Sequence, residues 1–165
     1  MGSGEERALT ALEQTGIEYA VTRHGRVGSL AEAATVRGVE PRDILKTLVV
    51  RRAEGEYVLV LVPGDREISW PLLRSHLGVS RLSMPDAAAA QEATGYERGT
   101  ITPFGATHTG SVGPWPVVAD RTIAGRTVSM GAGGHGVAVT VSADAMIAAL
   151  GADVAEITEP AQTRD

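Results

Sequence analysis

The chain has 165 residues, of which 43% are hydrophobic and 21% are charged, as in an ordinary globular domain. It has no cysteine, which excludes disulfides, thiolate catalysis and zinc–thiolate sites, and its net charge of −5 argues against indiscriminate nucleic-acid binding. No apolar run approaches the roughly 20 residues of a membrane span, and no signal peptide is visible. We therefore expect a cytoplasmic protein that binds neither membranes nor DNA.

The sequence of the first half of the chain predicts helices and strands whose ends are marked by capping residues and turns. Capping serines open the helices and glycines close them, while the strands are apolar runs that turns separate. The elements expected here are a helix over 3–15, a strand over 18–23, a helix over 29–38, a helical turn over 41–44, and a hairpin with strands 45–52 and 57–62.

The second half follows the same signals, apart from one long irregular segment. Residues 95–114 are rich in glycine and have no periodic apolar pattern, and such a stretch in a small domain is typically a functional loop or disordered. The other elements expected are helices over 69–78, 86–95 and 142–150, strands over 116–119, 126–130 and 137–141, and short strands near 81–83 and 154–157.

Together these elements predict a single α+β domain over residues 1–165, with a mixed, mostly antiparallel β-sheet flanked by helices. The core is expected over about 5–158 and a polar tail over 159–165. No internal repeat and no linker divides the chain.

Lys46 is the most informative single residue, because it is the only lysine beside fourteen arginines. Guanidinium is a flat, permanently charged fork, whereas ammonium is a compact point charge, so the two are not interchangeable. Lys46 also opens an apolar run, 46–50, that is typical of a buried strand. Two interpretations stay open: a functional ammonium at the mouth of a strand, or one lysine that survived in an arginine-rich composition.

The charge is unevenly distributed along the chain. Residues 21–52 carry seven basic and three acidic side chains, so the remainder sums to −9. Such asymmetry suits a protein with one face for a polyanion, and an equally good interpretation is a set of arginines scattered over a solvated surface. On the first interpretation, the candidate phosphate contacts are Arg23, Arg26, Arg51 and Arg52.

Several common sites are excluded by their motifs. The glycine-rich stretches lack a Gly-x-x-x-x-Gly-Lys-Ser/Thr sequence and do not join a strand to a helix, which rules out Walker and Rossmann nucleotide sites. The four histidines show no paired spacing with one another or with a carboxylate, so we expect no metal and no cofactor. Ser111 and Ser129 lack the context of a nucleophile elbow, so a serine hydrolase is set aside.

Residues 99–105, with the sequence Gly-Thr-Ile-Thr-Pro-Phe-Gly, are the best candidate for a ligand-binding loop. Glycine lets a backbone approach a ligand closely, and proline stiffens the far end of such a loop. Consecutive N–H groups that point the same way would form a pocket for a carbonyl or an oxyanion. The motif Gly-x-x-x-Pro alone is weak, and a plain surface turn is the alternative.

The order of these pieces resembles a known family, the YbaK/EbsC group of aminoacyl-tRNA deacylases, which are related to the editing domain of bacterial prolyl-tRNA synthetase. The similarity covers about residues 5–158, and it depends on the ordered set more than on any single motif. The pieces are Lys-Thr-Leu-Val at 46–49, Val-Leu-Val-Pro-Gly-Asp at 60–65, Thr-Gly-Tyr at 94–96, the loop at 99–105, Pro-Val-Val-Ala-Asp at 116–120, and a glycine-rich turn before 137–141.

The resemblance implies trans-editing, which is hydrolysis of the ester between a wrong amino acid and its tRNA, usually tRNA(Pro) carrying a small residue such as Cys or Ala. It implies aminoacyl-tRNA as a partner, with prolyl-tRNA synthetase as a further one. The catalytic positions that match the family are Lys46, Gly99, Thr100, Ile101, Thr102 and Pro103. The substrate-binding positions are Thr47, Phe104, Gly105, Asp120, Gly133 and His135.

Two of these positions vary within the family. Thr47 follows the lysine as in the cysteinyl-specific branch, whereas the alanyl-specific branch tends to have asparagine there. His135 falls in a turn where some members place a histidine and others a Lys-Arg pair. Neither position alone assigns a substrate.

On this interpretation catalysis needs no protein nucleophile, because an amino-acid ester is already activated. Loop N–H groups at 99–102 would hold the carbonyl, and Lys46 would bind the phosphate of the terminal adenosine or orient its ribose. Water, or a thiol of the substrate itself, would attack. Two alternatives stay open: a catalytically silent module that binds tRNA or a synthetase, and a small-molecule ester or amide hydrolase on the same scaffold.

Overall fold

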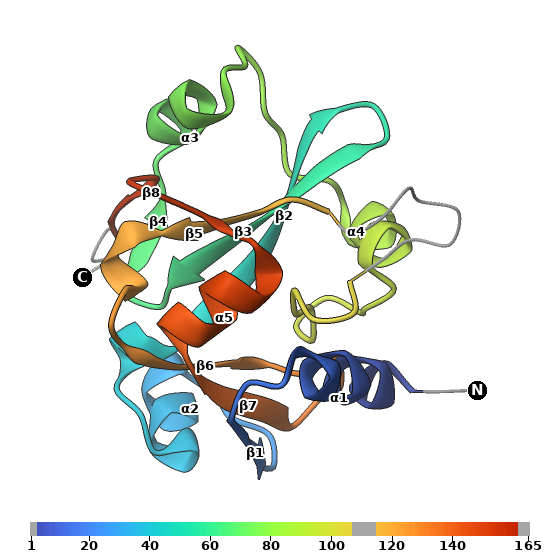
Figure 1. Cartoon of the computed structure of the whole chain (residues 1–165), viewed down its shortest axis with the longest axis vertical. Coiled ribbons are helices and arrows are strands. Elements are labelled where there is room, and N and C mark those ends of the chain that lie inside the picture. The colour runs from blue at the N-terminus through green and yellow to red at the C-terminus, as the bar shows by residue number, and fades with distance from the viewer. Residues whose placement is uncertain (1–2, 107–114, 162–165) are drawn as a thin grey trace.

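Each helix begins and ends at the residues that its capping signals indicate. The computed structural model describes residues 3–106 and 115–161, and five α-helices form within them (Figure 1). At each one a serine or aspartate side chain caps the first turn, and a glycine with positive φ follows the last residue. No helix in these ranges is long and apolar enough to cross a membrane. The helices are α1 (Gly4–Thr15), α2 (Leu30–Arg37), α3 (Trp70–Leu77), α4 (Ala87–Thr94) and α5 (Ala143–Leu150).

The strands of the described residues form two larger sheets and one small one. The four-stranded sheet has the order β2-β3-β5-β8, the three-stranded sheet has the order β1-β7-β6, and β4 pairs with β9. All neighbours are antiparallel except β3 with β5 and β5 with β8, so the predicted fold class is confirmed. The strands are β1 (Tyr19–Arg23), β2 (Leu45–Ala53), β3 (Glu56–Pro63), β4 (Arg66–Ile68), β5 (Val117–Asp120), β6 (Thr127–Gly131), β7 (Val137–Ser142), β8 (Asp153–Ala155) and β9 (Thr158–Pro160).

The core lies on both faces of β3, which is buried along almost its whole length. Leu59 and Leu61 belong to a large cluster shared with the three-stranded sheet and α5. Val58, Val60 and Val62 belong to a second cluster that α3 covers, because successive side chains of a strand point to opposite faces. In the view of Figure 1, α5 lies between the two larger sheets. Strand β2 is left at the edge of its sheet, with one side open.

The short strand predicted over 81–83 does not form. Ser83 and Arg51 of β2 exchange two backbone hydrogen bonds, with N···O distances of 2.8 and 3.1 Å, and they make one isolated bridge. Pro85 follows two residues later and has no N–H to donate, so it cannot extend the ladder. This prediction was wrong because a strand needs more than one paired residue.

Strands β4 and β9 are absent from the sequence prediction, and β9 falls largely in the stretch assigned to a polar tail. The ordered pairing therefore extends beyond the core limits that the sequence indicated. Side-chain and loop contacts hold the pair: Nε of Arg66 donates to Oγ1 of Thr158 at 2.6 Å, and the N–H of Ala161 donates to the carbonyl of Asp65 at 3.1 Å. Strands this short and polar have too little alternation to be recognised from sequence.

The irregular segment predicted over 95–114 is described as far as residue 106, and it contains no helix or strand there. Its remainder, which includes Ser111, lies outside the described residues. The same holds for residues 162–165 of the predicted tail.

Candidate functional site

A cavity of about 660 Å³ runs along the open edge of β2. Among the described residues, the outer side of this strand is paired only near its ends, where Ile44 bridges to Ser129 and Arg51 bridges to Ser83. The stretch from Ile44 to Val49 forms one wall. The remaining lining residues are Arg37, Met84, Pro85, Asp86, Ala87, Ala90, Arg98, Gly99, Ile101 and Gly131.

Lys46 lines this cavity, and its side chain is exposed. Its Nζ donates to the carbonyl oxygen of Arg66 at 3.1 Å. Arg66 lies opposite Pro160 in the antiparallel pair of β4 and β9. The neighbouring pair is hydrogen-bonded, because the N–H of Ala161 donates to the carbonyl of Asp65. Bonded and non-bonded pairs alternate along such strands, so the backbone of Arg66 makes no hydrogen bond to β9. The Arg66 carbonyl is thus free for Lys46. The ammonium keeps two further donors, which suits an anionic or hydroxyl-bearing ligand.

The loop after α4 is held by contacts on the side away from the cavity. The Tyr96 hydroxyl donates to the carbonyl of Phe104 at 2.5 Å, and the guanidinium carbon of Arg7 lies 4.3 Å from the centre of the Tyr96 ring. The N–H of Gly133 donates to the carbonyl of Thr100 at 2.9 Å. Burial raises the pKa of the Tyr96 hydroxyl, and Arg7 opposes that shift. The hydroxyl therefore stays protonated at neutral pH and keeps its bond.

Only part of this loop faces the cavity. Gly99 and Ile101 line it, whereas residues 102–104 are buried. The N–H of Thr100 donates to the carbonyl of Glu97 at 2.9 Å, so it is not available to a ligand. Within the described parts of the chain, the N–H groups of Gly99 and Ile101 have no acceptor. These two are the donors that the loop can offer to an oxyanion.

The glycines of the predicted site differ in what surrounds them. A Cβ on Gly105 would lie 2.9 Å from Oη of Tyr96, and one on Gly133 would clash with the carbonyl oxygen of Gly4. Both glycines therefore permit close packing behind the loop. Gly99 has a φ of +89°, and a Cβ there would meet no atom of the other described residues within 4 Å, its two chain neighbours apart. It faces open space, as a glycine beside a ligand should.

A second cavity of about 580 Å³ adjoins the first. Arg37, Gly99 and Gly131 line both cavities and form the boundary between them. The other lining residues of the second cavity are His24, Gly25, Arg26, Val27, Gly134, His135, Gly136 and Val137. The first cavity is mostly apolar with Lys46 at its wall, and the second is basic.

Asp120, predicted to contact substrate, lies at the end of β5 and lines neither cavity. It is 1% exposed, and its carboxylate accepts from the backbone N–H of Thr122 at 3.2 Å, from the Thr122 hydroxyl, and from the N–H of Ile157 at 3.3 Å. These bonds cap the 3₁₀ turn Arg121–Ile123 and fasten the segment after β8. The structure does not bring Asp120 together with Lys46.

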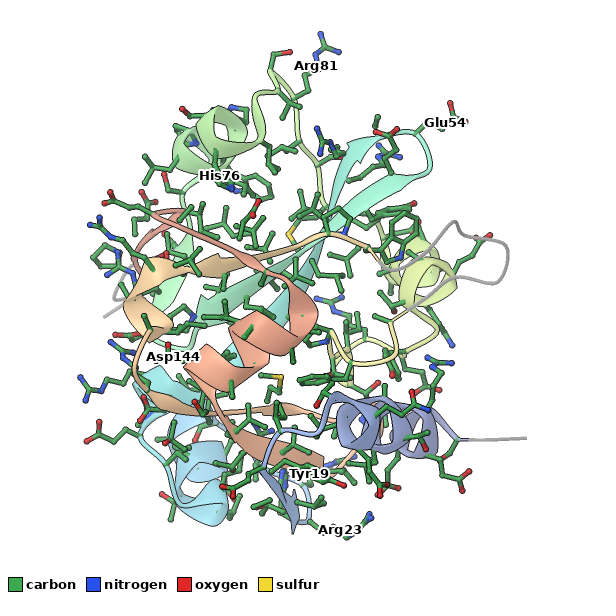
Figure 2. All side chains as sticks on the ribbon, viewed as in Figure 1. Tyr19, Arg23, Glu54, His76, Arg81 and Asp144 are labelled. Atoms are coloured by element: carbon green, nitrogen blue, oxygen red, sulfur yellow. The ribbon has the colours of Figure 1, made fainter. Side chains whose placement is uncertain are left out.

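The four arginines predicted to contact tRNA do not share one surface. Arg23 ends β1 and makes an ion pair with α1, whereas Arg51 and Arg52 lie on the β2–β3 hairpin. Figure 2 shows Arg23 and Glu54, in the turn of that hairpin, at opposite ends of the molecule. Of the four, Arg26 lines one of the two cavities. The basic stretch is contiguous in sequence but passes from one sheet to the other.

Three side chains at the cavities have polar atoms that are shielded from water and have no partner among the described residues. They are Nε2 of His24, Nε of Arg37 and Oγ1 of Thr47. Burial also lowers the pKa of the Arg37 guanidinium. The sequence singled out Thr47 through the family resemblance, but it did not single out Arg37. A basic residue in the last turn of a helix is ordinary, because it suits the helix dipole, so position 37 carries no signal of its own.

Comparison with known proteins identifies a family for this arrangement. The family described as the aminoacyl-tRNA editing domain matches residues 24–149, which include every lining residue of both cavities. The proline–tRNA ligase of Thermosipho africanus is 36% identical over 80 residues, which are 48% of this chain and 14% of the ligase. That of Moorella thermoacetica is 36% identical over 77 residues, which are 47% of this chain and 13% of the ligase. The chain thus spans about a seventh of the length of these curated relatives.

Two solved structures share the fold. A hypothetical protein has a TM-score of 0.82 and 26% identity, covering 93% of this chain and 100% of that one. A protein named as a candidate trans-editing enzyme for prolyl tRNA synthetase has a TM-score of 0.82 and 24% identity, covering 96% of this chain and 99% of that one. With the family match extending over most of its length and over both cavities, this chain belongs to the aminoacyl-tRNA editing domain family.

Proposed function

We propose that this chain is a cytoplasmic trans-editing deacylase, which hydrolyses the ester of a tRNA(Pro) that carries a small wrong amino acid such as Cys or Ala. The observation that carries the proposal is that Lys46 lines one cavity together with Gly99 and Ile101, whose N–H groups have no acceptor among the described residues. An ammonium and two backbone donors are suited to hold a nucleotide end and to stabilise an oxyanion. The similarity to proline–tRNA ligases favours tRNA(Pro), with prolyl-tRNA synthetase as the partner that presents it.

The reaction needs water as its only other reactant. The water oxygen attacks the ester carbonyl carbon, and the negative charge that develops on the carbonyl oxygen is stabilised by the N–H groups of Gly99 and Ile101. The intermediate collapses with cleavage of the bond to the ribose oxygen, which takes up the proton that the water has lost. The products are the free amino acid and a tRNA with its hydroxyl restored.

In this proposal the other residues of the loop hold it in position and do not contact the ester. Thr100 holds the loop to the glycine-rich turn through its carbonyl, and residues 102–104 anchor its far end in the core. Lys46, fixed through Arg66, presents its remaining donors to the terminal ribose or its phosphate. Positioning of this kind supplies most of the rate for an activated ester.

Thr47 is the proposed contact to the amino acid. Thr47 lines the first cavity, and its hydroxyl, although shielded from water, has no partner among the described residues. A hydroxyl can accept a hydrogen bond from an α-ammonium group or from a cysteine thiol. Because only Cys has a thiol, this contact favours Cys over Ala. Threonine at position 47 also resembles the cysteinyl-specific branch of the family.

The test is to incubate the protein with a panel of tRNA(Pro) species charged with Cys, Ala or Pro and to follow the loss of the ester. We expect faster hydrolysis of the Cys and Ala esters than of the Pro ester. Binding without hydrolysis of any ester would make the chain a silent tRNA-binding module. Equal rates on free amino-acid esters and on charged tRNA would make it a small-molecule hydrolase.

A further inference from the structure

Arg37 is the last residue of α2, and its side chain lines both cavities. It shares the boundary between them with Gly99, whose N–H is a proposed oxyanion donor, and with Gly131. A cation at this boundary lies beside the position proposed for the ester. It can therefore contact a ligand group that is joined to the ester through a few bonds.

The charge of Arg37 is not balanced by any of the described residues. Within residues 3–106 and 115–161, its guanidinium has no ion pair and no hydrogen bond, and its Nε is shielded from water without an acceptor. Burial disfavours the charged form, as the lowered pKa of this group indicates. A half-buried cation without a partner costs stability, so an anion from a ligand would be favourable here.

The surroundings of Arg37 extend the positive site into the second cavity. His24, Arg26 and His135 line this cavity as well, and no Asp or Glu is among its described lining residues. Glu97 lies 3.1 Å from Nε2 of His135, but it is exposed and does not line the cavity. Two guanidinium groups around one hollow attract anions, and the two imidazoles can add N–H donors.

An aminoacyl-tRNA has one kind of anion near its ester. The carboxylate of the amino acid is consumed in the ester bond, and its amino group is cationic, so the nearest negative charges are the phosphates of the tRNA 3′ end. We propose that Arg37 binds the phosphodiester closest to the ester and that the second cavity receives the sugar–phosphate backbone of the 3′ end. This inference rests on the proposed function. It directs the tRNA past Arg26 and away from the hairpin that carries Arg51 and Arg52.

The test is binding of an uncharged single-stranded RNA that ends in CCA, measured by fluorescence anisotropy at several salt concentrations. Arg37→Gln should weaken binding roughly tenfold or more, as expected for loss of a charged hydrogen bond. It should reduce the slope of log K against log salt by about 0.7, the value for one phosphate contact on a single strand. Arg37→Lys should keep the slope but recover only part of the affinity, because a point charge lacks the planar fork.

Arg81→Gln is the matched control. Arg81 is exposed, lines neither cavity, and lies at the far end of the molecule from Arg23 in Figure 2. Its replacement should change neither the affinity nor the salt slope. An equal loss in Arg37→Gln and Arg81→Gln would mean that the RNA responds to net charge alone, and the proposal would be wrong.

Thermal denaturation separates binding from a structural role. If Arg37 only stabilised the C-terminus of α2, Arg37→Gln would lower the melting temperature and leave RNA binding by the folded protein unchanged, which would overturn the proposal. A binding role predicts a melting temperature equal to or above that of the wild type, because an unpaired desolvated charge is removed.

Hydrolysis of mischarged tRNA separates failure of this inference from failure of the proposed function. Arg37→Gln should raise KM and largely keep kcat. Wild-type hydrolysis with an unchanged KM in Arg37→Gln would overturn the inference alone. RNA binding that depends on Arg37, without any hydrolysis, would overturn the proposed function alone. Displacement of the RNA by free amino acid would assign Arg37 to the product carboxylate and overturn the inference.

Discussion

The hydroxyl of Tyr96 and the carbonyl oxygen of Phe104, 2.5 Å apart, close the loop after α4 from behind. Gly99 and Ile101, which face the first cavity, lie between the two residues that this bond joins. The geometry of the proposed oxyanion donors thus depends on a hydrogen bond that touches no ligand.

Tyr96→Phe should lower the free energy of unfolding by about 1–3 kcal/mol, because it leaves the buried carbonyl of Phe104 without its donor. The rate of ester hydrolysis should fall as well, since the loop loses a support. Thermal denaturation and single-turnover deacylation measure the two effects. Tyr19→Phe is the control, because the Tyr19 side chain is exposed and its replacement should alter neither quantity.

Tyr96 also makes the free energy of unfolding depend on pH. Burial raises the pKa of Tyr96 above its ordinary value of 10.0, so above that pH the unfolded chain loses a proton that the native protein keeps. The unfolded state then binds fewer protons, and the free energy of unfolding falls as the pH rises above about 10. Denaturant titrations between pH 9 and pH 11 should show a shallower decline in Tyr96→Phe than in the wild type. Equal declines would contradict the assignment.

Lys46→Ala should reduce deacylation on the order of 100-fold, a typical loss when one group that stabilises the transition state is removed. Lys46→Arg should do nearly as much damage, because the compact ammonium is replaced by a wider fork. The folded state should be retained, since the side chain is exposed and, within the described residues, makes one hydrogen bond, to Arg66. Wild-type turnover in the arginine variant would exclude a specific need for ammonium, and loss of the fold would indicate a structural role.

Gly99→Ala should impair hydrolysis and Gly99→Val should impair it more, because each adds atoms in the space that the ester would occupy. Gly99 also has a positive φ, so any side chain there costs about 1–2 kcal/mol of stability. Gly125→Ala is the matched control: Gly125 has a φ of +77°, no atom of the other described residues lies within 4 Å of its Cβ position apart from its chain neighbours, and it lines neither cavity. Binding of uncharged tRNA should hardly change.

The result for Gly99 has a clear threshold. Deacylation rates within about twofold of the wild type in both variants correspond to a change of roughly 0.4 kcal/mol or less in the barrier. In that case the loop would not be the oxyanion site.

Asp120→Asn should destabilise the fold by about 1–3 kcal/mol, because an amide cannot accept from all the donors that surround this buried carboxylate. The folded protein should keep its kcat, since Asp120 lines neither cavity. Calorimetry and steady-state deacylation below the melting temperature test this pair of outcomes. A fall in kcat with no change in stability would restore the substrate contact that the family resemblance implies.

The sequence predicts the helices well because their signals are local. Ser29 and Gly38 act on N–H and carbonyl groups within a few residues, so α2 can be located from its own segment. Strand partners are distant in sequence, which is why the sequence pattern indicates a strand at Ser83 and a tail at β9.

The residues of the candidate site likewise differ in whether the sequence alone can identify them. Lys46 and Gly99 stand out by composition and by motif, and the fold brings both to one cavity. The roles of Arg37 and Asp120 depend on what surrounds each side chain after folding: a guanidinium without a partner at a cavity boundary, and a carboxylate whose oxygens are already used. No residue pattern in the sequence carries that information.

The pairing of β4 with β9 links Lys46 to a part of the chain that lines neither cavity. The carbonyl that holds its Nζ belongs to Arg66, and the Arg66 guanidinium is held by Thr158. Proteolysis, or a fused partner that pulled β9 away from β4, would release the ammonium from its tether while leaving every cavity residue in place. The proposed editing activity would then be weakened by strain on the strand at 158–160, without any change in the residues that line the cavities.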